Sequence, residues 1–401
     1  MKTNIGVFFG GRSTEHEISV ISANQAMAAI DRERFDVTPI YITKDGKWYT
    51  GEALMDVANY RDIPALLSRC TPVFMRPLYN DYGVYTLKKG LFGKENIRTV
   101  TTLDVVIPVL HGHDGEDGTF QGILQSTDIP FAGCDVLASA NGMDKITMKM
   151  ILSADNIPVV DYVWFTDKQW FKQQDELIAK IESKIGYPVI IKPANLGSSV
   201  GIARADNREA LIAKVAEAEK YSTRIIVEHL VEQLQEINCS VLGDCNDYRM
   251  SVLEEPIKSG EILSYTDKYM GGTKTTQGMQ ASKKRIPADL PKEMTERIQF
   301  LAGETFRVLG CHGVSRVDVI VDRKDNSIYV NEINTIPGSL SFYLWEATGL
   351  TFTALMTELV QLALRRKRDM GMKTVSYDQN IFSMGGGTKG AKGAKGAKFH
   401  K

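Results

Sequence analysis

The stretch RVDVIVDRKDNSIYVNEINTIPG, residues 316–338, has the pattern of two strands joined by a polar turn. Valines alternate with other side chains over 317–322, as they do on a strand with one buried face. The RKDNS segment at 323–327 has the composition of a turn, and apolar residues resume at 328–330. We therefore expect a β-hairpin that ends at a Pro-Gly pair.

Three oxygen-bearing side chains would meet on this hairpin. Asp318 lies near the start of the first strand, and Glu332 and Asn334 end the second, two residues apart and therefore on one face. Such an oxygen-only set suits Mg²⁺. Arg316 would share the face of Asp318 and place a cation beside the metal, and Pro337-Gly338 would leave a backbone N–H free to point at an anion. A surface hairpin whose acids face water is an equally open interpretation of this stretch alone.

The composition is that of a soluble globular protein with two or three domains. The 401 residues are 43% hydrophobic and 24% charged, and the net charge of −1 argues for neither a nucleic-acid nor a membrane partner. No apolar run reaches the length of a membrane span, and the N-terminus has the pattern of a short strand and not of a signal peptide. Few, scattered cysteines predict a cytoplasmic protein with reduced thiols. The cysteines are Cys70, Cys134, Cys239, Cys245 and Cys311.

The first part of the chain alternates strands with helices. Residues 4–9 predict a buried strand, which a Gly-Gly turn and a helical pattern follow. Glu15 lies in this turn and either complements the helix dipole or holds a substrate amine. A second buried strand at 103–110 leads into a glycine-rich loop that begins at His111. This pattern predicts an open parallel sheet with ligands at the carboxyl ends of its strands.

The central part of the chain carries a candidate phosphate loop. The strand at 188–193 places Lys192 ahead of a loop at 195–201 that contains Ser198-Ser199. A Gly/Ser loop can wrap phosphate oxygens with backbone N–H groups while a lysine supplies a point charge. The GxxxxGK[ST] order of a Walker P-loop is absent, and the strand–loop–strand pattern favours a β-hairpin flap. Upstream, Asp144-Lys145 opens a predicted helix.

Two acids on later strands are candidate nucleoside contacts. A strand at 224–230 carries Glu228 near its end, and a strand at 236–243 begins with Glu236. Such a segment can bind an adenine amine through backbone carbonyls and a ribose through an acid, although solvated strand ends give the same pattern. The Gly/Thr/Lys-rich segment at 264–285 has hardly any periodicity and is typical of a functional lid or of disorder.

Eight segments, in this order and spacing, resemble the D-alanine–D-alanine ligase family of the ATP-grasp superfamily. The resemblance covers roughly residues 4–365; each segment alone is modest, but the eight together are highly specific. The segments are GGRSTEHEIS (10–19), HGHDGEDGTFQG (111–122), MDK (143–145), VIIKPANLGSSVG (189–201), VEHL (227–230), DKY (267–269), GVSRVDV (313–319) and NEINTIPG (331–338).

The resemblance implies an α/β, three-domain ATP-grasp architecture, in which two α+β domains clamp ATP beside an N-terminal open parallel α/β domain. We expect the N-terminal substrate domain at 1–138 and the central subdomain with the phosphate flap at 139–223. The C-terminal subdomain with the lid and the metal site is expected at 224–371. A flexible Gly/Lys-rich tail, which either solubilises the chain or contacts a polyanion, is expected at 372–401.

The family's reaction joins two D-alanines for peptidoglycan synthesis. ATP phosphorylates the carboxylate of the first D-alanine, the amine of the second attacks the acyl phosphate, and the dipeptide, ADP and phosphate result. The resemblance therefore implies ATP and two Mg²⁺ ions, with Mn²⁺ as a possible substitute. It also implies small amino-acid substrates, no nucleic-acid or membrane partner, and a cytoplasmic homodimer.

The resemblance also implies a role for individual residues. Arg316 and the Gly338 N–H would stabilise the tetrahedral, oxyanion-like state, and Glu15 would bind the first ammonium and join Ser198 and Tyr269 across the closing lid. The implied metal ligands are Asp318, Glu332 and Asn334. The implied ATP-binding residues are Lys145, Lys192, Ser199, Glu228, His229, Leu230, Glu236 and Lys268. The implied substrate residues are Glu15, His111, Arg316, Ser341 and Tyr343.

The segment that follows Gly338 departs from the family pattern. The family usually has a serine five residues beyond this glycine that meets the second substrate's carboxylate, and here Tyr343 stands there, with Ser341 two residues earlier. The segment at 230–236 is about one residue longer than usual, and the lid lacks the common sequence beyond DKY. The acceptor therefore stays open between D-alanine and another amino acid, while Tyr269 favours an amine over D-lactate. A nucleotide-binding protein without catalysis is the remaining alternative, and the intact metal set argues against it.

Overall fold

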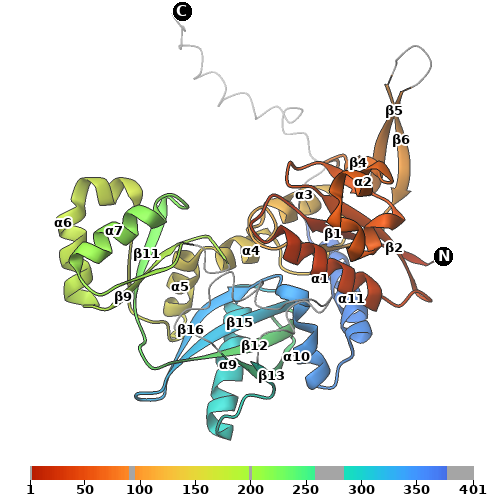
Figure 1. The fold of residues 1–401 in the computed structure, drawn as a ribbon. Helices are drawn as coiled ribbons and strands as arrows, with labels where there is room; N and C mark the ends of the chain where they lie inside the picture. The colour runs from red at the N-terminus through yellow and green to blue at the C-terminus, as the bar shows by residue number, and fades with distance from the viewer. Residues whose placement is uncertain (1, 90–94, 198–200, 258–283, 377–401) are drawn as a thin grey trace, which may run out of the picture.

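The computed structural model describes residues 2–89, 95–197, 201–257 and 284–376, which form three sheets with flanking helices (Figure 1). The sheets have seven, four and five strands in chain order. Figure 1 shows the four-stranded sheet with its helices as a lobe beside the other two units, to which α4 and α5 connect it. The predicted three-part α/β architecture is therefore confirmed.

The N-terminal sheet is only partly parallel. Its strand order is β6-β5-β4-β3-β2-β1-β7, and only β2, β1 and β7 run parallel to one another. The other four strands are antiparallel, which corrects the prediction of an all-parallel sheet. The connections from β2 to β3, from β4 to β5 and from β5 to β6 are too short for the crossovers that parallel pairing requires. The strands are β1 (Thr3–Gly10), β2 (Phe35–Ile42), β3 (Trp48–Thr50), β4 (Thr71–Met75), β5 (Gly83–Lys89), β6 (Glu95–Thr102) and β7 (Val105–Val109).

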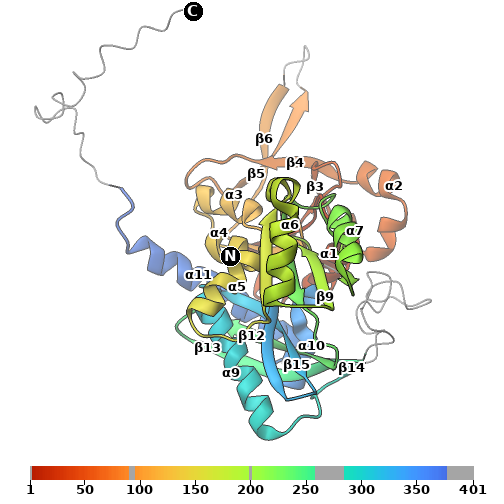
Figure 2. The same cartoon turned by 90° about the vertical axis from the view of Figure 1, so that its left-hand side faces the viewer.

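The helices of this unit cover the parallel strands, and the β5–β6 hairpin extends away from the body of the molecule (Figures 1 and 2). The boundary predicted at 138 falls inside α4, because the Asp135 side chain accepts from Ala138 N and starts the helix earlier. The helices are α1 (His16–Ala29), the 3-10 turns η1 (Glu52–Met55) and η2 (Val57–Arg61), α2 (Ile63–Ser68), α3 (Thr119–Thr127) and α4 (Val136–Met143).

The central sheet has the order β10-β9-β11-β8 and packs against α6 and α7. Strand β11 pairs with both β8 and β9, so the boundary predicted after 223 cuts through this sheet. Strands β9 and β10 form the predicted antiparallel flap. The elements are α5 (Lys145–Ala154), β8 (Tyr162–Thr166), α6 (Asp167–Lys184), β9 (Val189–Pro193), β10 (Ala203–Ala205), α7 (Arg208–Ala218) and β11 (Arg224–His229).

The third sheet is antiparallel, with the order β14-β13-β12-β15-β16, and α9 covers one face. Its last two strands are the hairpin expected from the sequence. The elements are β12 (Leu234–Gly243), β13 (Tyr248–Pro256), β14 (Lys284–Arg285), α9 (Lys292–Val308), β15 (Gly313–Asp322), β16 (Ser327–Asn334), the 3-10 turn η5 (Gly338–Ser341), α10 (Phe342–Ala347) and α11 (Phe352–Gly371).

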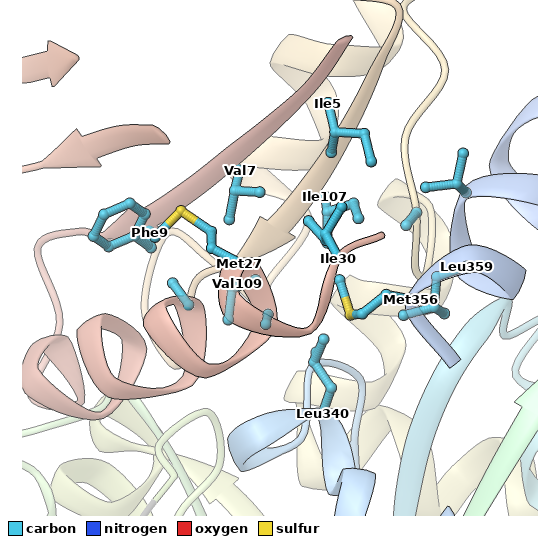
Figure 3. Packing of buried hydrophobic residues seen from close by; sticks show 14 of the residues in the cluster. Ile5, Val7, Phe9, Met27, Ile30, Ile107, Val109, Leu340, Met356 and Leu359 are labelled. Atoms are coloured by element: carbon cyan, nitrogen blue, oxygen red, sulfur yellow. The ribbon is translucent and has the colours of Figure 1, made fainter. Parts of the chain in front are cut away.

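One hydrophobic core joins the two ends of the chain. Figure 3 shows Met356 and Leu359 of α11 beside apolar side chains of β1, α1 and β7. Leu340, in the turn after the hairpin, belongs to the same core and is 3% exposed. Burial of several such side chains, each worth roughly 2 kcal/mol, fixes this turn against α1. The carboxyl end of β16 is thereby held beside the N-terminal unit.

Among the described residues, no single helix is long and apolar enough to cross a membrane, and one bent pair, Gly338–Ala347 with Phe352–Gly371, passes by length and composition alone. The five cysteines are all free thiols, as expected.

Candidate active site

The β15–β16 hairpin brings the predicted metal ligands together. Asp318 pairs with Glu332 across the two strands, and Arg316 pairs with Asn334. Asn334 Nδ2 donates to Asp318 Oδ2 at 3.1 Å. Asp318 is only 3% exposed, which contradicts the interpretation of the stretch as a surface hairpin whose acids face water.

Arg316 and Asp318 form a bidentate ion pair. Arg316 Nε donates to Oδ1 at 2.6 Å and Nη2 donates to Oδ2 at 2.7 Å. Burial raises the pKa of Asp318, Arg316 acts against this rise, and the carboxylates of Glu332 and Glu236 add to it. The donor set is oxygen-only and its carboxylates crowd one another, which is a chemistry that fits Mg²⁺.

Two lysines from the central unit reach this hairpin. Lys145, in the first turn of α5, lies with Nζ 3.2 Å from Glu332 Oε2. Lys192, on β9, donates from Nζ to Asn331 Oδ1 at 3.1 Å. Both lysines are buried at 6% exposure, so their charges lie in a medium of low dielectric. The candidate site therefore lies between the four-stranded and the five-stranded sheets.

A third lysine completes a buried charge cluster around Glu228. Glu228 Oε2 accepts from Lys192 Nζ at 2.7 Å, and Oε1 lies 3.2 Å from Lys149 Nζ. Burial alone would raise the pKa of Glu228, but Lys149 and Lys192 outweigh it and lower this pKa to about 2. Burial lowers the pKa of Lys149, and Glu228 opposes that effect. Glu228 is thus ionised and shared by two lysines, one of which is a predicted phosphate ligand.

The carboxylate of Glu15 lies where two loops approach each other. A Cβ at Gly112, in the loop after β7, would be 2.7 Å from Glu15 Oε2 and 2.5 Å from Ser13 Oγ. A Cβ at Gly197, in the loop after β9, would be 3.1 Å from the same Glu15 atom. Absence of side chains at these glycines lets both loops reach the carboxylate. Glu15 therefore lies beside the loop that follows β9, and its contact with a substrate ammonium stays a prediction.

His111 holds the backbone beside Gly338. Its Nδ1 lies 2.8 Å from Ile336 O, and its Nε2 lies 2.9 Å from Ser22 Oγ. Ile336 O can only accept, so the neutral ring carries its proton on Nδ1, and Nε2 accepts from the hydroxyl of Ser22, which in turn accepts from Ser339 N at 2.9 Å. Burial lowers the pKa of His111, and Glu15 acts against this effect. The neutral ring thus positions the turn, and direct substrate contact by His111 stays a prediction.

Glu116 supports the same turn from the other side. Its Oε1 accepts from Ile336 N and its Oε2 accepts from Gly112 N, both at 2.9 Å. Burial, with a smaller effect of Glu15, raises the pKa of Glu116 to about 8. Two loops that border the site are therefore tied together by one buried carboxyl group.

The turn after Gly338 has an unusual backbone. Ser339, Leu340 and Ser341 have φ values of 52°, 51° and 51°, in the left-handed region that non-glycine residues rarely adopt. Each such residue costs on the order of 1 kcal/mol, and the core around Leu340 holds the turn against this cost. The Ser341 hydroxyl is fully buried and has no hydrogen-bond partner among the described residues.

Tyr343 points its hydroxyl at a carboxylate of the third sheet. Its O–H donates to Glu254 Oε2 at 2.9 Å, and burial raises the pKa of Tyr343. A hydroxyl has one proton, so the Tyr343 hydroxyl could donate to the carboxylate of a substrate only if it no longer donated to Glu254. The predicted role of Tyr343 as the direct carboxylate ligand does not match this arrangement.

The other predicted nucleotide residues lie at the ends of β11 and β12. The exposed His229 donates from its backbone N to Asp161 O at 2.9 Å, and Leu230 N donates to Pro188 O at 3.4 Å. Glu236 lies opposite Ile320 of β15, on the same sheet as the metal ligands. Four predicted residues lie outside the described ranges, namely Ser198, Ser199, Lys268 and Tyr269.

Sequence reasoning missed Lys149, Ser22 and the supporting role of Glu116. Lys149 carried a signal, because it follows Lys145 by one helical turn and shares its face. Glu116 lies in the glycine-rich loop that the sequence singled out, but its contact with Ile336 joins positions 220 residues apart. Ser22 looks like any small residue of a helix, and the sequence held no signal for it.

Lys145 of α5 and Lys192 of β9 both reach the β15–β16 hairpin of the next sheet, which is the arrangement expected of an ATP-grasp ligase. Residues 4–134 match the family described as D-ala D-ala ligase N-terminus, and residues 151–361 match D-ala D-ala ligase C-terminus. The chain belongs to the D-alanine–D-alanine ligase family.

Relatives match the chain over almost its whole length. A D-alanine--D-alanine ligase of Caldicellulosiruptor bescii is 40% identical and covers 94% of this chain and 99% of the relative. A D-alanine--D-alanine ligase of Thermosipho melanesiensis is 37% identical, and the match covers 95% of this chain and 98% of the relative. Among solved structures, a D-Ala:D-Ser ligase from Enterococcus faecalis is similar with a TM-score of 0.76, 33% identity, and 90% and 100% coverage. The D-alanine-D-alanine ligase from Coxiella burnetii is similar with a TM-score of 0.74 and 28% identity, and the match covers 92% of this chain and 96% of that chain.

Proposed function

We propose that this protein joins two D-alanines at the expense of ATP, through a D-alanyl phosphate. The ion pair between Lys145 and Glu332, 3.2 Å long, carries the proposal. It connects a predicted phosphate ligand on the central unit with a predicted metal ligand on the hairpin. Phosphoryl transfer depends on positioning and on charge stabilisation, and both kinds of group are assembled here.

The nucleotide would lie between the two sheets. Lys145 and Lys192 would hold its phosphates, with Ser199 and Lys268 as further contacts. Asp318, Glu332 and Asn334 would hold two Mg²⁺ ions, which when bound spread the charge of the transferring phosphoryl group. The base and ribose would contact Glu228, His229, Leu230 and Glu236.

The amino-acid substrates would lie on the N-terminal side of the hairpin. Glu15 would bind the ammonium of the first D-alanine, within the proposed trio with Ser198 and Tyr269. Arg316 and the Gly338 N–H would stabilise the oxyanion that forms when the second amine attacks. The hydrogen bonds of His111 and Glu116 to Ile336 support this assignment, because they fix the backbone that presents the Gly338 N–H.

A second candidate acceptor is D-serine. The residues after Gly338 differ from the family pattern, and the Tyr343 hydroxyl is already bound to Glu254. The similarity to a D-Ala:D-Ser ligase at 33% identity is a further reason to include this acceptor. D-Alanine remains the leading proposal because the relatives named above are D-alanine--D-alanine ligases.

The biological setting follows from the same proposal. A D-Ala–D-Ala ligase supplies the dipeptide for peptidoglycan and acts in the cytoplasm, which the five free thiols support. We also propose a homodimer, as the family resemblance implies, and light scattering of the purified chain tests it. The three units are proposed to follow the sheets, with the second and third dividing after His229.

An acceptor screen tests the function. The purified chain with ATP, Mg²⁺ and D-alanine is expected to release phosphate and to form D-Ala-D-Ala, measured by mass spectrometry. Turnover with D-serine or another amino acid, but not with D-alanine, would replace the leading proposal with the alternative acceptor. ATP binding without phosphate release from any acceptor would instead indicate a non-catalytic nucleotide-binding protein.

A further inference from the structure

A polar cluster near Arg316 contains a lysine that has no role in the assignments above. The cluster consists of Asn238, Glu254 and Lys284 of the third sheet and Tyr343 of α10. Glu254 is its centre: Oε2 accepts from the Tyr343 hydroxyl at 2.9 Å and from Asn238 Nδ2 at 3.3 Å. Glu254 is 5% exposed, so the cluster is part of the interior and not of the surface.

Lys284 is the cation of this cluster. It lies on β14, opposite Pro256 of β13. Its Nζ lies 3.3 Å from the centroid of the Tyr343 ring and 3.6 Å from Glu254 Oε1. The side chain is 15% exposed, so the ammonium is held by its neighbours and still reachable from solution. Ring and carboxylate together fix the position of the charge.

The cluster lies on the acceptor side of the proposed reaction centre. Asn238 of this cluster pairs across the sheet with Glu254 on one side and with Asp318, the partner of Arg316, on the other. Lys145 and Lys192, the proposed phosphate ligands, come instead from α5 and β9 of the central unit. An acceptor whose amine approaches beside Arg316 therefore has its carboxylate free to extend toward Lys284.

The residues expected to bind that carboxylate are poorly placed to do so. The Tyr343 hydroxyl donates its proton to Glu254. The Ser341 hydroxyl is completely buried, within a left-handed turn that the core holds. Lys284 keeps three donor hydrogens, and its nearest carboxylate oxygen, at 3.6 Å, is beyond a short hydrogen bond.

We infer that Lys284 is a specificity-determining residue that binds the carboxylate of the acceptor amino acid, with Tyr343 and Glu254 holding its ammonium in place. This inference rests on the proposed ligase function. It selects acceptors that are small amino acids with a free α-carboxylate, and it disfavours amides of the same amino acids. The cluster substitutes a cation for the serine that stands in the family pattern.

The test compares acceptors that differ only in the carboxylate. Wild type and Lys284→Met receive ATP, Mg²⁺, D-alanine as donor, and D-alanine and D-alaninamide as competing acceptors, and mass spectrometry measures both products. The ratio of products gives the ratio of kcat/KM for the two acceptors. Loss of a charge-assisted hydrogen bond predicts a fall of about 10- to 100-fold in the preference for D-alanine in the variant. Lys284→Arg is expected to retain most of the preference.

A third acceptor separates binding of the carboxylate from the rest of the reaction. Hydroxylamine has no carboxylate and traps the acyl phosphate as D-alanine hydroxamate. We expect Lys284→Met to form hydroxamate at close to the wild-type rate, which also shows that the variant folds. The control is Arg285→Met, which removes the next cation along β14; Arg285 is 51% exposed and bound to Glu255, and its loss is expected to leave the acceptor preference unchanged.

The outcomes are distinct. Hydroxamate formation with an unchanged acceptor preference in Lys284→Met would overturn the role of Lys284 and leave the ligase function standing. An equal loss of hydroxamate and dipeptide would overturn it too, because Lys284 would then act before the acceptor binds. Absence of hydroxamate in wild type would overturn the ligase function and this inference with it.

Discussion

Replacement of Lys149 by methionine tests the buried cluster that holds Glu228. Methionine keeps the length and the apolar contacts of the side chain and removes only its charge. The pKa of Glu228 is about 2, against an ordinary 4.5, which corresponds to about 3 kcal/mol of stabilisation at about 1.4 kcal/mol per unit. The charge of Lys149 has the larger effect in lowering the pKa of Glu228, and the charge of Lys192 has the next largest. We expect Lys149→Met to reduce the free energy of unfolding by about 2 kcal/mol at pH 7.

The pH dependence of this loss has a definite sign. The pKa of Glu228 is lower in the folded chain, so its stabilisation is fully present above pH 4.5 and is lost as the pH falls toward 2. Lys149→Met raises that pKa and removes part of the stabilisation. The difference in the free energy of unfolding between wild type and the variant is therefore expected to be largest at pH 7 and to become smaller below about pH 4.5. Urea unfolding at several pH values measures it.

The same substitution is expected to weaken the binding of ATP. Glu228 would then depend on Lys192 alone, 2.7 Å away, and Lys192 would be less available to phosphates. The KM for ATP is expected to rise about 10-fold, as for the loss of about one charge-assisted contact. The matched control is Lys214→Met, which breaks an exposed 3.0 Å pair with Glu217 in the same unit and should cost less than about 1 kcal/mol. Equal stability and equal pH profiles for Lys149→Met and Lys214→Met would refute the reasoning.

Three further substitutions test the site. Glu332→Ala removes a proposed metal ligand and the partner of Lys145; dipeptide synthesis should fall below detection, and near-wild-type turnover would remove this residue from the metal set. Gly112→Ala places a Cβ 2.7 Å from Glu15 Oε2 at a φ of +72°; we expect a loss of about 1–3 kcal/mol in thermal unfolding and a higher KM for the donor, and unchanged values for both would contradict the proposed place of Glu15. The pKa of Glu116 is raised to about 8 by burial, so its ionisation costs stability as the pH rises from 4.5 to 8. Glu116→Gln should flatten the slope of Tm over that window, and a slope equal to that of wild type would argue against the raised pKa.

Local patterns were sufficient to predict the parts of the site that adjoin each other in sequence. The period-two pattern of 316–338 predicted the hairpin and the shared face of Asp318, Glu332 and Asn334, because side-chain direction on a strand alternates strictly. The position of Lys192 on a strand before a flap followed from the same rule. The capping pattern at Asp144-Lys145 likewise predicted the start of the helix that carries Lys145, a proposed phosphate ligand.

Contacts between distant elements could not be predicted in this way. Strand order is a property of pairing, so the antiparallel half of the first sheet and the membership of β11 in the second needed the structure. The hydroxyl of Tyr343 is directed by Glu254, which is 89 residues away. Its position five residues after Gly338 suggested contact with the second substrate. In the structure, the hydroxyl instead binds Glu254 of the third sheet.

The charges of the site are arranged so that ligands can exchange with protein partners. Each proposed phosphate or oxyanion cation is paired with a carboxylate of the chain: Lys145 with Glu332, Lys192 with Glu228, and Arg316 with Asp318. Removal of these charged groups from water costs free energy. This cost is therefore incurred when the chain folds and not when a ligand binds. In the proposed function, Asp318 and Glu332 would hold divalent cations, and Arg316 and Lys145 would then be available to the phosphates and the oxyanion. Lys149 makes the third exchange possible, because Glu228 keeps a buried cation when Lys192 turns to the nucleotide. Under the proposed function, these cations would therefore be paired with the chain's own carboxylates until metal and nucleotide bind.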